Sequence, residues 1–339
     1  MTDHGPLFDG LASARGAVAV MGSANADLTV RVAALPKPGE TIAGGPLAVL
    51  PGGKSANQAA TVAKLGVRAS LIGAVGDDPN GGMLRDALVG AGVDVAHLSQ
   101  SDEATGTAMI LVDDDAENCI VISPGANGTV DAGLVAKHAE AIRGADVLGL
   151  CLEVGDGAVV EAARIAADAG VTVVFNLSPV REVPTELLGL VDVLIVNEHE
   201  LAALVGDAAA AEGAESGDWS DAAAALAGKH GIRTTVVTLG AAGSVVVESG
   251  EAGDGAGAES AAVTATRVDP LPVDVVDTTG CGDSYMGSLM AGLASGLDTG
   301  DAARLAAAVS AYAAGGEGAQ ASYGTADQVR AFAETGRRG

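Results

Sequence analysis

Short runs of apolar, often β-branched residues alternate along the chain with longer Ala-rich stretches that carry charged residues at helical spacing. Runs of the first kind, bounded by Gly, Pro, Asn or Asp, predict buried strands, and stretches of the second kind predict amphipathic helices. The expected strands are 17–22, 69–76, 146–153, 172–179, 192–198, 234–240 and 244–249, and the expected helices between them include 55–66, 81–92, 158–170 and 221–231. This alternation predicts an α/β fold with a central, mostly parallel sheet that carries helices on both faces.

Two stretches break the alternation. Residues 27–50 and 105–123 contain the β-like runs DLTVRV, ETIAGG, TAMILVDDD and NCIVIS without a helical pattern between them. The residues VDDDAEN, where the last two runs meet, are typical of a hairpin. We expect a small β-sheet outside the main sheet, and a sheet in that position can close over a site as a lid.

Three segments show neither pattern. Residues 207–220 and 249–262 are rich in Gly, Ala and acidic side chains, and we expect them to form surface loops. Residues 1–15 are expected to form a flexible tail in front of one domain that spans residues 16–336.

Composition excludes several classes of partner. The formal net charge is −26 at pH 7, which argues against broad contact with nucleic acid or with an anionic membrane. Aromatic residues make up 2% of the chain, so we do not expect platforms on which single-stranded bases stack. A phosphate ligand stays compatible with this acidity, because a few backbone N–H groups and one Lys suffice to hold it.

The sequence favours a cytoplasmic protein. Its three cysteines, Cys119, Cys151 and Cys281, lie far apart and lack the spacing of a metal site, as is usual in a reducing compartment. The first residues lack the basic region and apolar stretch of a secretory signal, and no run of about 20 apolar residues is present. We therefore expect no contact with a membrane.

Residues 51–60, PGGKSANQAA, contain the Gly-Lys-Ser with which a nucleotide-binding P-loop ends. The full pattern, G-x-x-x-x-G-K-[ST], requires a glycine at position 48, where the chain has Ala48. The preceding residues also lack the long buried strand that normally leads into a P-loop. These residues alone leave open whether Lys54 contacts a phosphate or another ligand.

Polar residues recur where the expected strands end. They are Asn25, Asp27, Glu153, Asn176, Asn197, Glu200, Thr238 and Gly240. Ligands of an open parallel sheet bind beyond the carboxyl ends of its strands. A single Asn or Asp in such a place is usually a helix cap or a turn former. Their recurrence on strand after strand predicts a binding site at this edge.

The stretch DTTGCGDSYMGSLMAGLASG, residues 277–296, concentrates the chemistry. An expected strand, PVDVVD, leads into a turn in which Gly280 and Gly282 let N–H groups converge at the positive end of a new helix. Such a turn suits a phosphate that carries developing charge. Asp283 would repel that phosphate, so it either accepts the proton of an attacking hydroxyl or only complements the helix dipole. The residues alone leave both possibilities open.

The segment DTTGCGD resembles the C-terminal signature of the PfkB carbohydrate-kinase family, D-T-x-G-[AC]-G-D. Further stretches are similar to this family in order and spacing, and most like its ribokinases. They are GSANAD (22–27), LPKPGET (35–41), GGKSANQA (52–59), IGAVGDD (72–78), ATGTA (104–108), ENCIVISPGAN (117–127), VNEHE (196–200), TLGAAG (238–243) and GAQAS (318–322). The resemblance extends from residue 17 to about residue 335.

The resemblance implies a ribokinase-like kinase domain with a β-sheet lid. It also implies ATP-dependent transfer of the γ-phosphate to the primary hydroxyl of a sugar, foremost D-ribose, which would yield ribose 5-phosphate. The alternatives are a kinase for another sugar or a nucleoside, such as 2-deoxyribose or fructose, and a sugar-binding regulator without turnover. Asp283 and the N-x-x-E pattern at 197–200 are intact, which argues against the regulator.

The resemblance also implies roles for matched residues. The sugar would contact Asn25, Asp27, Gly52, Gly53, Lys54, Asn57 and Glu153. Asp283 would be the general base, beside an anion hole formed by Gly280, Cys281 and Gly282. The nucleotide would contact Asn197, Thr238, Gly240 and Gly243. On this interpretation GGKSAN binds the sugar and is not a P-loop.

Two metal ions are implied in the same way. Asn197 and Glu200 would organise Mg²⁺ largely through water, because this ion gives up its hydration shell reluctantly. A monovalent cation such as K⁺ would steady the anion-hole loop. Its ligands would come from Asp277, Thr279, Ala313, Gly316, Gly318 and Ser322.

Some positions depart from the family pattern. Ser55 replaces a usual Gly next to Lys54, which would affect the choice among pentoses. Residues 315–317, Gly-Gly-Glu, stand where a basic stretch is more usual, and the helix-like residues 305–316 lack the Asn or His often found near adenine. Cys281 is either an oxidisable thiol or a packing residue, and we favour packing. The lid is expected to form a homodimer by pairing its exposed β edges.

Overall fold

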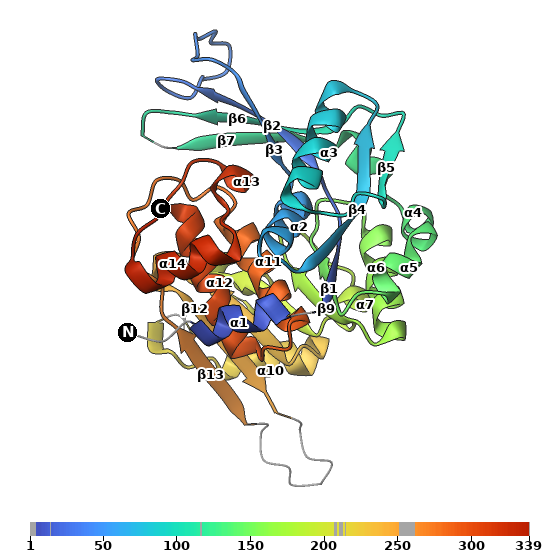
Figure 1. Cartoon of the computed structure of the whole chain (residues 1–339), viewed down its shortest axis with the longest axis vertical. Helices are drawn as coiled ribbons and strands as arrows, with labels where there is room; N and C mark the ends of the chain where they lie inside the picture. Colours follow the sequence, from blue (N-terminus) through green and yellow to red (C-terminus); the bar gives the residue numbers. More distant parts are fainter. Residues whose placement is uncertain are drawn as a thin grey trace.

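The computed structural model describes residues 5–13, 15–115, 117–206, 209, 213, 215–250 and 262–338. A large helix-covered sheet forms the body of the molecule, and a small sheet stands at one end of it (Figure 1). The strand order of the large sheet is β13-β12-β11-β10-β9-β8-β1-β4-β5. Its strands are β1 (Ala17–Met21), β4 (Arg68–Gly76), β5 (Leu98–Ser101), β8 (Val147–Leu150), β9 (Thr172–Asn176), β10 (Val193–Asn197), β11 (Thr234–Thr238), β12 (Ser244–Ser249) and β13 (Val263–Val268).

The predicted parallel sheet is confirmed, with an antiparallel margin that the sequence did not indicate. The pairs from β11 to β5 are parallel, whereas β12 runs antiparallel to both β11 and β13. The prediction of a strand at 272–277 is wrong, because these residues lie in neither sheet and Val275 and Val276 are exposed. β13 takes the edge position instead, and its exposed polar residues are typical of an edge strand.

Helices cover both faces of the large sheet, as predicted. Strand residues alternate between two cores, so that Val18 and Val20 point to one and Ala19 and Met21 to the other. The first core is covered by α1 (Gly5–Ser13), α2 (Lys54–Lys64), α3 (Pro79–Ala91), α11 (Cys281–Ala294), α12 (Thr299–Ala314) and α14 (Ala326–Thr335). The second is covered by α4 (Ala132–Lys137), α5 (Ala139–Arg143), α6 (Asp156–Ala169), α7 (Thr185–Leu188), α8 (Glu198–Val205) and α10 (Ser220–His230).

The N-terminal region differs from the flexible tail that we expected. Residues 5–13 form α1, and Leu7, Phe8 and Leu11 are buried in the first core. These apolar residues fall on one face of the helix. The guanidinium of Arg330 on α14 lies 5.7 Å from the Phe8 ring and adds a cation–π contact. The helix is therefore docked on the domain.

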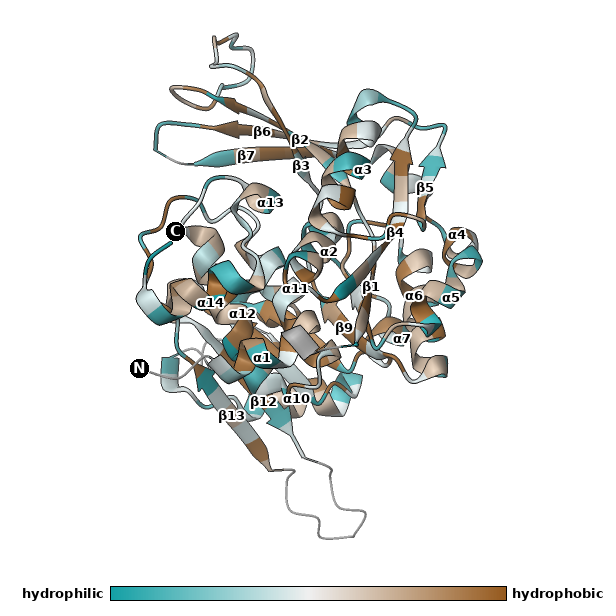
Figure 2. Cartoon of the chain, in the orientation of Figure 1, coloured by the Kyte–Doolittle hydropathy of each residue, from teal (hydrophilic) through white to brown (hydrophobic). Residues whose placement is uncertain are grey.

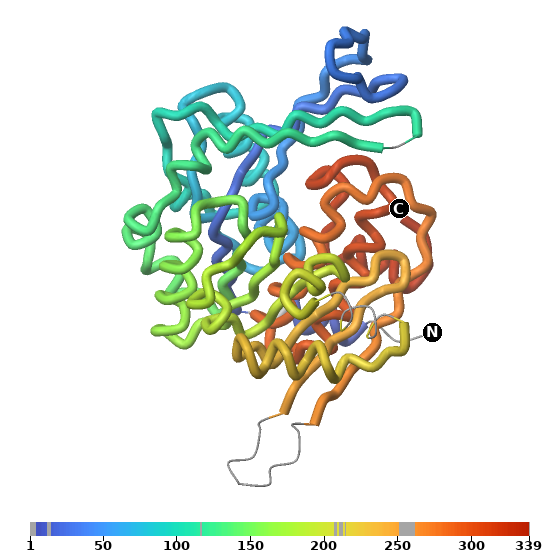
Figure 3. The backbone as a smooth tube through the Cα atoms, turned by 180° about the vertical axis from the view of Figure 1, so that it is seen from behind, coloured from blue at the N-terminus to red at the C-terminus, as the bar shows by residue number. Residues whose placement is uncertain are grey.

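The small sheet has the order β3-β2-β6-β7 and consists of β2 (Asn25–Arg31), β3 (Ala48–Gly52), β6 (Gly106–Val112) and β7 (Asn118–Ser123). The predicted β6–β7 hairpin is present. The run at 40–45 is not a strand, and β3 begins only at Ala48. The β6–β7 hairpin lies over the short helix α13 (Ala319–Ser322) when seen from either side (Figures 1 and 3). We call this sheet the lid.

The two predicted acidic loops have different outcomes. Residues 251–261, nearly all of the second loop, lie outside the described residues. In the first loop, 207–220, the described residues 209, 213, 215 and 216 are helical and Trp219 is buried, so the expectation of a surface loop is wrong for them. Among the described residues, no helix is long and apolar enough to cross a membrane.

Candidate active site

The lid meets the body at Asp27. In the antiparallel β2–β3 pair, Asn25 lies opposite Gly52 and Asp27 opposite Leu50. A Cβ at Gly52 would collide with the carboxylate of Asp27. At Gly53, where φ is +89°, a Cβ would lie 2.7 Å from the backbone nitrogen of Asn25. A side chain at either position would clash with the neighbouring chain around β2, so both positions require glycine. The close approach places Asp27 next to the start of α2.

Glu153, which follows β8, also lies at the start of α2. Its Oε2 accepts hydrogen bonds from the backbone N–H of Lys54, at 3.0 Å, and from the hydroxyl of Ser23. A carboxylate at the first N–H of α2 is favoured by the positive end of that helix. This N-terminus is thus engaged by an acid, which is a physical argument against a P-loop at 51–60.

Asn25 is fixed by Asn127, a residue of the 3-10 helix η1 (Gly125–Thr129). The amide nitrogen of Asn127 donates to Oδ1 of Asn25 at 2.8 Å, and its oxygen accepts from the backbone N–H of Ala24 at 3.0 Å. Both Asn side chains are buried. The contact therefore sets which way the amide of Asn25 points.

Three carboxylates, those of Asp27, Glu153 and Asp283, lie near enough to interact and form a carboxylate cluster. Burial, then the charges of Glu153 and Asp283, raise the pKa of Asp27 to about 7. Burial alone would lower the pKa of Lys54, but the carboxylates of Asp283 and Glu153 outweigh it and hold this pKa above its usual value. Lys54 is therefore charged and offsets part of the repulsion among the acids. A polyol suits such a place, because its hydroxyl groups donate to carboxylates.

Asp283 lies in the first turn of α11 and is buried. Its Oδ2 accepts a hydrogen bond of 2.9 Å from Nδ2 of Asn57 on α2. The Oδ1 of Asn57 in turn accepts from Nε2 of Gln320 on α13, at 3.0 Å. Burial raises the pKa of Asp283 to about 6, although Lys54 and Asn57 act in the opposite direction. The carboxylate is thus deprotonated at neutral pH and has the basicity of a general base.

The turn before Asp283 presents N–H groups to the site. Gly280 caps α11 with φ +73°, and its carbonyl accepts from the hydroxyl of Tyr323 at 2.9 Å. The N–H of Cys281 donates to the carbonyl of Thr278 at 3.1 Å. Within the described part of the chain, the N–H groups of Gly280 and Gly282 have no acceptor. They fit an anion better than the N–H of Cys281 does.

The thiol of Cys281 is a packing group. Burial raises its pKa to about 11, and the residue packs against Ala313, Ala319 and Tyr323. A thiol with such a pKa is protonated at neutral pH and is a poor nucleophile. This agrees with the favoured interpretation from the sequence.

The hydroxyl of Ser55 points away from the predicted sugar-binding residues. Its buried hydroxyl lies 3.2 Å from the sulfur of Cys151 and 3.4 Å from the carbonyl of Met21. A Cβ at Gly22 would collide with it. Ser55 would therefore affect the choice among pentoses only indirectly, by changing the packing beneath Lys54.

Asn197 and Glu200 form a capping box at the start of α8. Oδ1 of Asn197 accepts from the N–H of Glu200, and Oε2 of Glu200 accepts from the N–H of Asn197, both at 2.8 Å. Burial raises the pKa of Glu200, with Asn197 and Lys54 acting against it. No group of three or more acidic, His or Cys side chains that suits a metal occurs among the described residues. One carboxylate beside phosphate oxygens and water still fits Mg²⁺.

The predicted nucleotide residues come together at the ends of two neighbouring strands. Thr238, the last residue of β11, lies opposite Asn197 of β10, and its hydroxyl donates to the carbonyl of Val196 at 3.4 Å. Gly240 starts the 3-10 helix η2 (Gly240–Ala242), and Gly243 precedes β12. A Cβ at Gly243 would collide with the carbonyl of Val268. This glycine therefore has a packing role.

Three of the six residues expected to hold K⁺, namely Asp277, Ala313 and Ser322, already use their oxygens in hydrogen bonds. The carboxylate of Asp277 accepts from the N–H groups of Thr279, at 2.8 Å, and Gly318, at 2.9 Å. The carbonyl of Ala313 accepts from Gly316 at 3.0 Å, and the hydroxyl of Ser322 donates to Ala319. The loop is thus closed by its own hydrogen bonds, and the residues fit a monovalent ion only in part.

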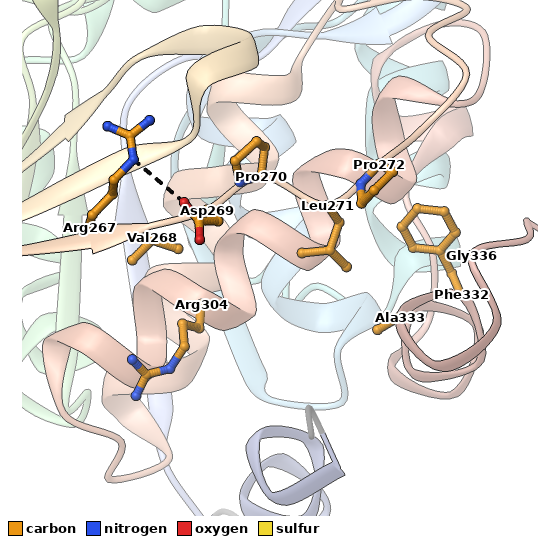
Figure 4. Close-up of a pocket in the computed structure, with 10 residues that line it drawn as sticks. All are labelled: Arg267, Val268, Asp269, Pro270, Leu271, Pro272, Arg304, Phe332, Ala333 and Gly336. Carbon is orange, nitrogen blue, oxygen red and sulfur yellow. Dashed lines mark ion pairs between the residues drawn. The ribbon is translucent and has the colours of Figure 1, made fainter. Parts of the chain in front are cut away.

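A separate pocket lies between residues 267–272, Arg304 of α12 and the end of α14 (Figure 4). It contains the ion pair of Arg267 and Asp269, with a distance of 3.5 Å. None of the predicted site residues lines it. The predicted catalytic and substrate-binding residues lie instead around the carboxylate cluster at the start of α2.

The fold and this site define an α/β enzyme that transfers a phosphoryl group to a hydroxyl. The chain belongs to the pfkB family of carbohydrate kinases, which it matches over residues 16–326. A ribokinase of Haemophilus influenzae is 33% identical over 323 residues, which cover 94% of this chain and 99% of the relative. One of Schizosaccharomyces pombe is 35% identical over 313 residues, with 90% and 94% covered.

Solved structures agree. The structure of Arabidopsis thaliana ribokinase complexed with ribose and ATP matches with a TM-score of 0.82 at 30% identity, covering 94% of this chain and 99% of that one. The resemblance on which the sequence expectations were built is thereby confirmed.

Four side chains of the site went unassigned from the sequence. Ser23, Asn127 and Gln320 lie inside motifs that carried the resemblance, so their positions were visible but their partners were not. Arg338 lies outside every motif, and only the structure shows that it contacts the loop at 312–322.

Proposed function

We propose that this protein is an ATP-dependent kinase that phosphorylates D-ribose to ribose 5-phosphate. The observation that carries the proposal is Asp283, a buried carboxylate with a raised pKa at the N-terminus of α11, hydrogen-bonded to Asn57 within the carboxylate cluster. Support comes from ribokinases that align over nearly the whole chain, one of them solved as a complex with ribose and ATP.

The residues divide the work. Asp27, Asn25 and Lys54 bind the sugar hydroxyls, with Glu153 holding the start of α2. Asp283 accepts the proton of the primary hydroxyl as it attacks the γ-phosphate, a role typically worth about 10²–10⁴-fold in rate. The N–H groups of the α11 turn stabilise charge on the transferred phosphoryl group.

The nucleotide and its Mg²⁺ belong at the ends of β10 and β11. Thr238, Gly240 and Gly243 line the phosphates and the ribose of ATP, and Asn197 and Glu200 face Mg²⁺ through water. The ion would neutralise charge on the phosphates. A positive charge near the carbonyls of the loop at residues 313–322 would stabilise this loop and the turn before α11.

We also propose a homodimer through the lid. Strand register places Val49, Leu28, Met109 and Val121 in one row across the lid, on the face opposite to Asp27. Three of the four are exposed, and much of β6 and β7 is hydrophobic (Figure 2). An apolar row in this position is costly in water, and a second lid packed on it would bury the row.

We place the protein in the cytoplasm. Cys119, Cys151 and Cys281 are all free thiols in the structure, which suits a reducing compartment.

The first test is a substrate panel. Release of ADP from ATP and Mg²⁺ would be measured with ribose, 2-deoxyribose, fructose, adenosine and uridine. The proposal expects ribose to give the highest kcat/KM. Another sugar in first place would keep the mechanism and change the substrate, whereas no turnover with any of them would favour a sugar-binding regulator.

A further inference from the structure

The segment after α14 returns to the end of α12 and places Arg338 there. Its Nη1 donates to the carbonyls of Tyr312, at 2.9 Å, and Ala313, at 3.4 Å, and its Nη2 donates to the carbonyl of Ser322 at 2.9 Å. The guanidinium also lies 4.4 Å from the centre of the Tyr312 ring. The two carbonyls of α12 are at the negative end of that helix, where a cation is favoured.

The loop is shaped around this guanidinium. A Cβ at Gly316 would collide with it, and one at Gly315 would lie 3.6 Å from Cδ of Arg338. Residues 315–317 are those that replace a more usual basic stretch. The small residues there make room for a basic group that arrives from a position distant in the sequence.

Arg338 shares one oxygen, the carbonyl of Ala313, with the cluster at which a monovalent cation is expected, and its guanidinium lies beside Gly316 of the same cluster. Ala313 is common to both sets of contacts, and Ser322 contributes its carbonyl to the guanidinium while its hydroxyl turns to Ala319. We propose that Arg338 is a resident cation of this loop, and that turnover consequently depends little on added K⁺. The proposal rests on the kinase function proposed above.

Arg338 is connected to Asp283 and to Gly280 through α13 and the residue that follows it. Ser322, which accepts from Arg338, ends α13, and Gln320 of the same helix fixes Asn57, which binds Asp283. The adjacent Tyr323 holds the carbonyl of Gly280. Arg338 touches neither Asp283 nor Gly280, so it is a positioning residue for both the base and the α11 turn.

A second cation supports the same short helix. The ammonium of Lys64 donates to the carbonyls of Gln320, at 2.6 Å, and Tyr323, at 3.0 Å. Burial and the charge of Arg338 lower the pKa of Lys64. The side chains of Arg338 and Lys64 thus bind carbonyl oxygens in α13 and next to it. In other proteins bound ions supply such charges.

The experiment compares cations and variants. ADP release with ribose, ATP and Mg²⁺ is measured in potassium chloride and in tetramethylammonium chloride at equal ionic strength, for wild type, R338Q and R337Q. Arg337 is exposed and serves as the matched control. We expect K⁺ to stimulate wild type and R337Q less than about twofold, and R338Q about tenfold or more, because charged hydrogen bonds are lost and an ion can replace them.

The melting temperature gives a readout that does not need turnover. K⁺ should raise it for R338Q and leave it unchanged for wild type. Strong K⁺ stimulation of wild type that R338Q reproduces would overturn the proposal, as would an R338Q enzyme with wild-type rates in both salts. If R338Q does not fold, R338K replaces it. Lysine keeps the charge but lacks the planar fork with which the guanidinium bonds carbonyls on two segments, so K⁺ should stimulate R338K more than wild type. An unchanged K⁺ ratio would overturn the proposal as well.

The two proposals can fail separately. Wild type that phosphorylates no sugar in either salt contradicts the kinase function, and the melting temperatures then decide on Arg338 alone.

Discussion

Asn57 donates a hydrogen bond of 2.9 Å to the carboxylate of Asp283 and so joins α2 to α11. The two residues are 226 positions apart in the chain and come from the motifs GGKSANQA and DTTGCGD. The bond connects the proposed sugar-binding residues with the proposed anion-binding turn. A kinase needs this connection, because the attacking hydroxyl and the γ-phosphate must meet at one point.

The pH dependence of kcat/KM for ribose should follow the two perturbed acids. Asp283 must be deprotonated to accept a proton, and Asp27 must be deprotonated to accept sugar hydroxyls. Their pKa values, about 6 and about 7, predict a rate that falls as the pH drops from about 8 to about 5. A profile that stays flat down to about pH 5 would show that neither raised pKa governs the reaction.

Gln320 should matter for turnover without contacting the substrate. It holds Oδ1 of Asn57, so its loss frees the amide of Asn57 to rotate and weakens the bond to Asp283. We expect Gln320→Ala to lower kcat about tenfold with little change in KM, since one charge-assisted hydrogen bond is typically worth about 1.5–3 kcal/mol.

Gln100→Ala is the control for this variant, because Gln100 is exposed on β5. Steady-state kinetics with ribose as the varied substrate would separate the two constants. Equal kcat values for Gln320→Ala and the control would remove Gln320 from the account.

Gly287 sets the distance between α2 and α11. A Cβ at this position would lie 2.6 Å from the carbonyl oxygen of Gln58, too close for a backbone atom to be accommodated without a shift. Gly287→Ala should therefore cost about 1–3 kcal/mol of folding free energy and lower turnover by displacing Asn57 from Asp283.

The matched control is Gly90→Ala in α3, where a Cβ would meet nothing within 4 Å. It should stabilise the protein by roughly 0.5–1 kcal/mol, as Ala does in a helix interior. Urea unfolding of both variants measures the difference. A Gly287→Ala protein as stable as wild type would mean that the helices can separate freely.

The proposed dimer can be broken at the outer face of the lid. Val121→Lys places a charge in the apolar row formed with Met109, and a buried unpaired charge disfavours association. Sedimentation should find wild type as a dimer and Val121→Lys as a monomer. Val89→Lys, at an exposed position on α3, should remain dimeric, and a monomeric wild type would refute the interface.

Much of the fold was predictable because its buried strands are continuous apolar runs between turn residues. The edge strand of the large sheet was not predictable, because β13 has polar residues at exposed positions. The apolar residues of 272–277 have the pattern of a strand, although Val275 and Val276 face solvent. The helix α1 was missed because its three buried residues form too short a pattern to show periodicity.

The site residues, too, were predictable only in part. Asp283 and Lys54 were predictable, since each lies in a dense local motif. The contacts of Arg338 were not, because they go to backbone carbonyls, and the glycines at 315 and 316 that leave room for the guanidinium do not indicate which residue fills it. The hydrogen bond from the N–H of Cys281 to the carbonyl of Thr278 could not be predicted from the sequence either.

The most direct test of the central claim is the turnover of Asp283→Asn with ribose, ATP and Mg²⁺, measured beside its affinity for ATP. The substitution keeps the shape of the side chain and removes its basicity. The account predicts a loss of about 10²–10⁴-fold in kcat with ATP binding preserved. Turnover within about tenfold of wild type would contradict the assignment of Asp283 as the general base.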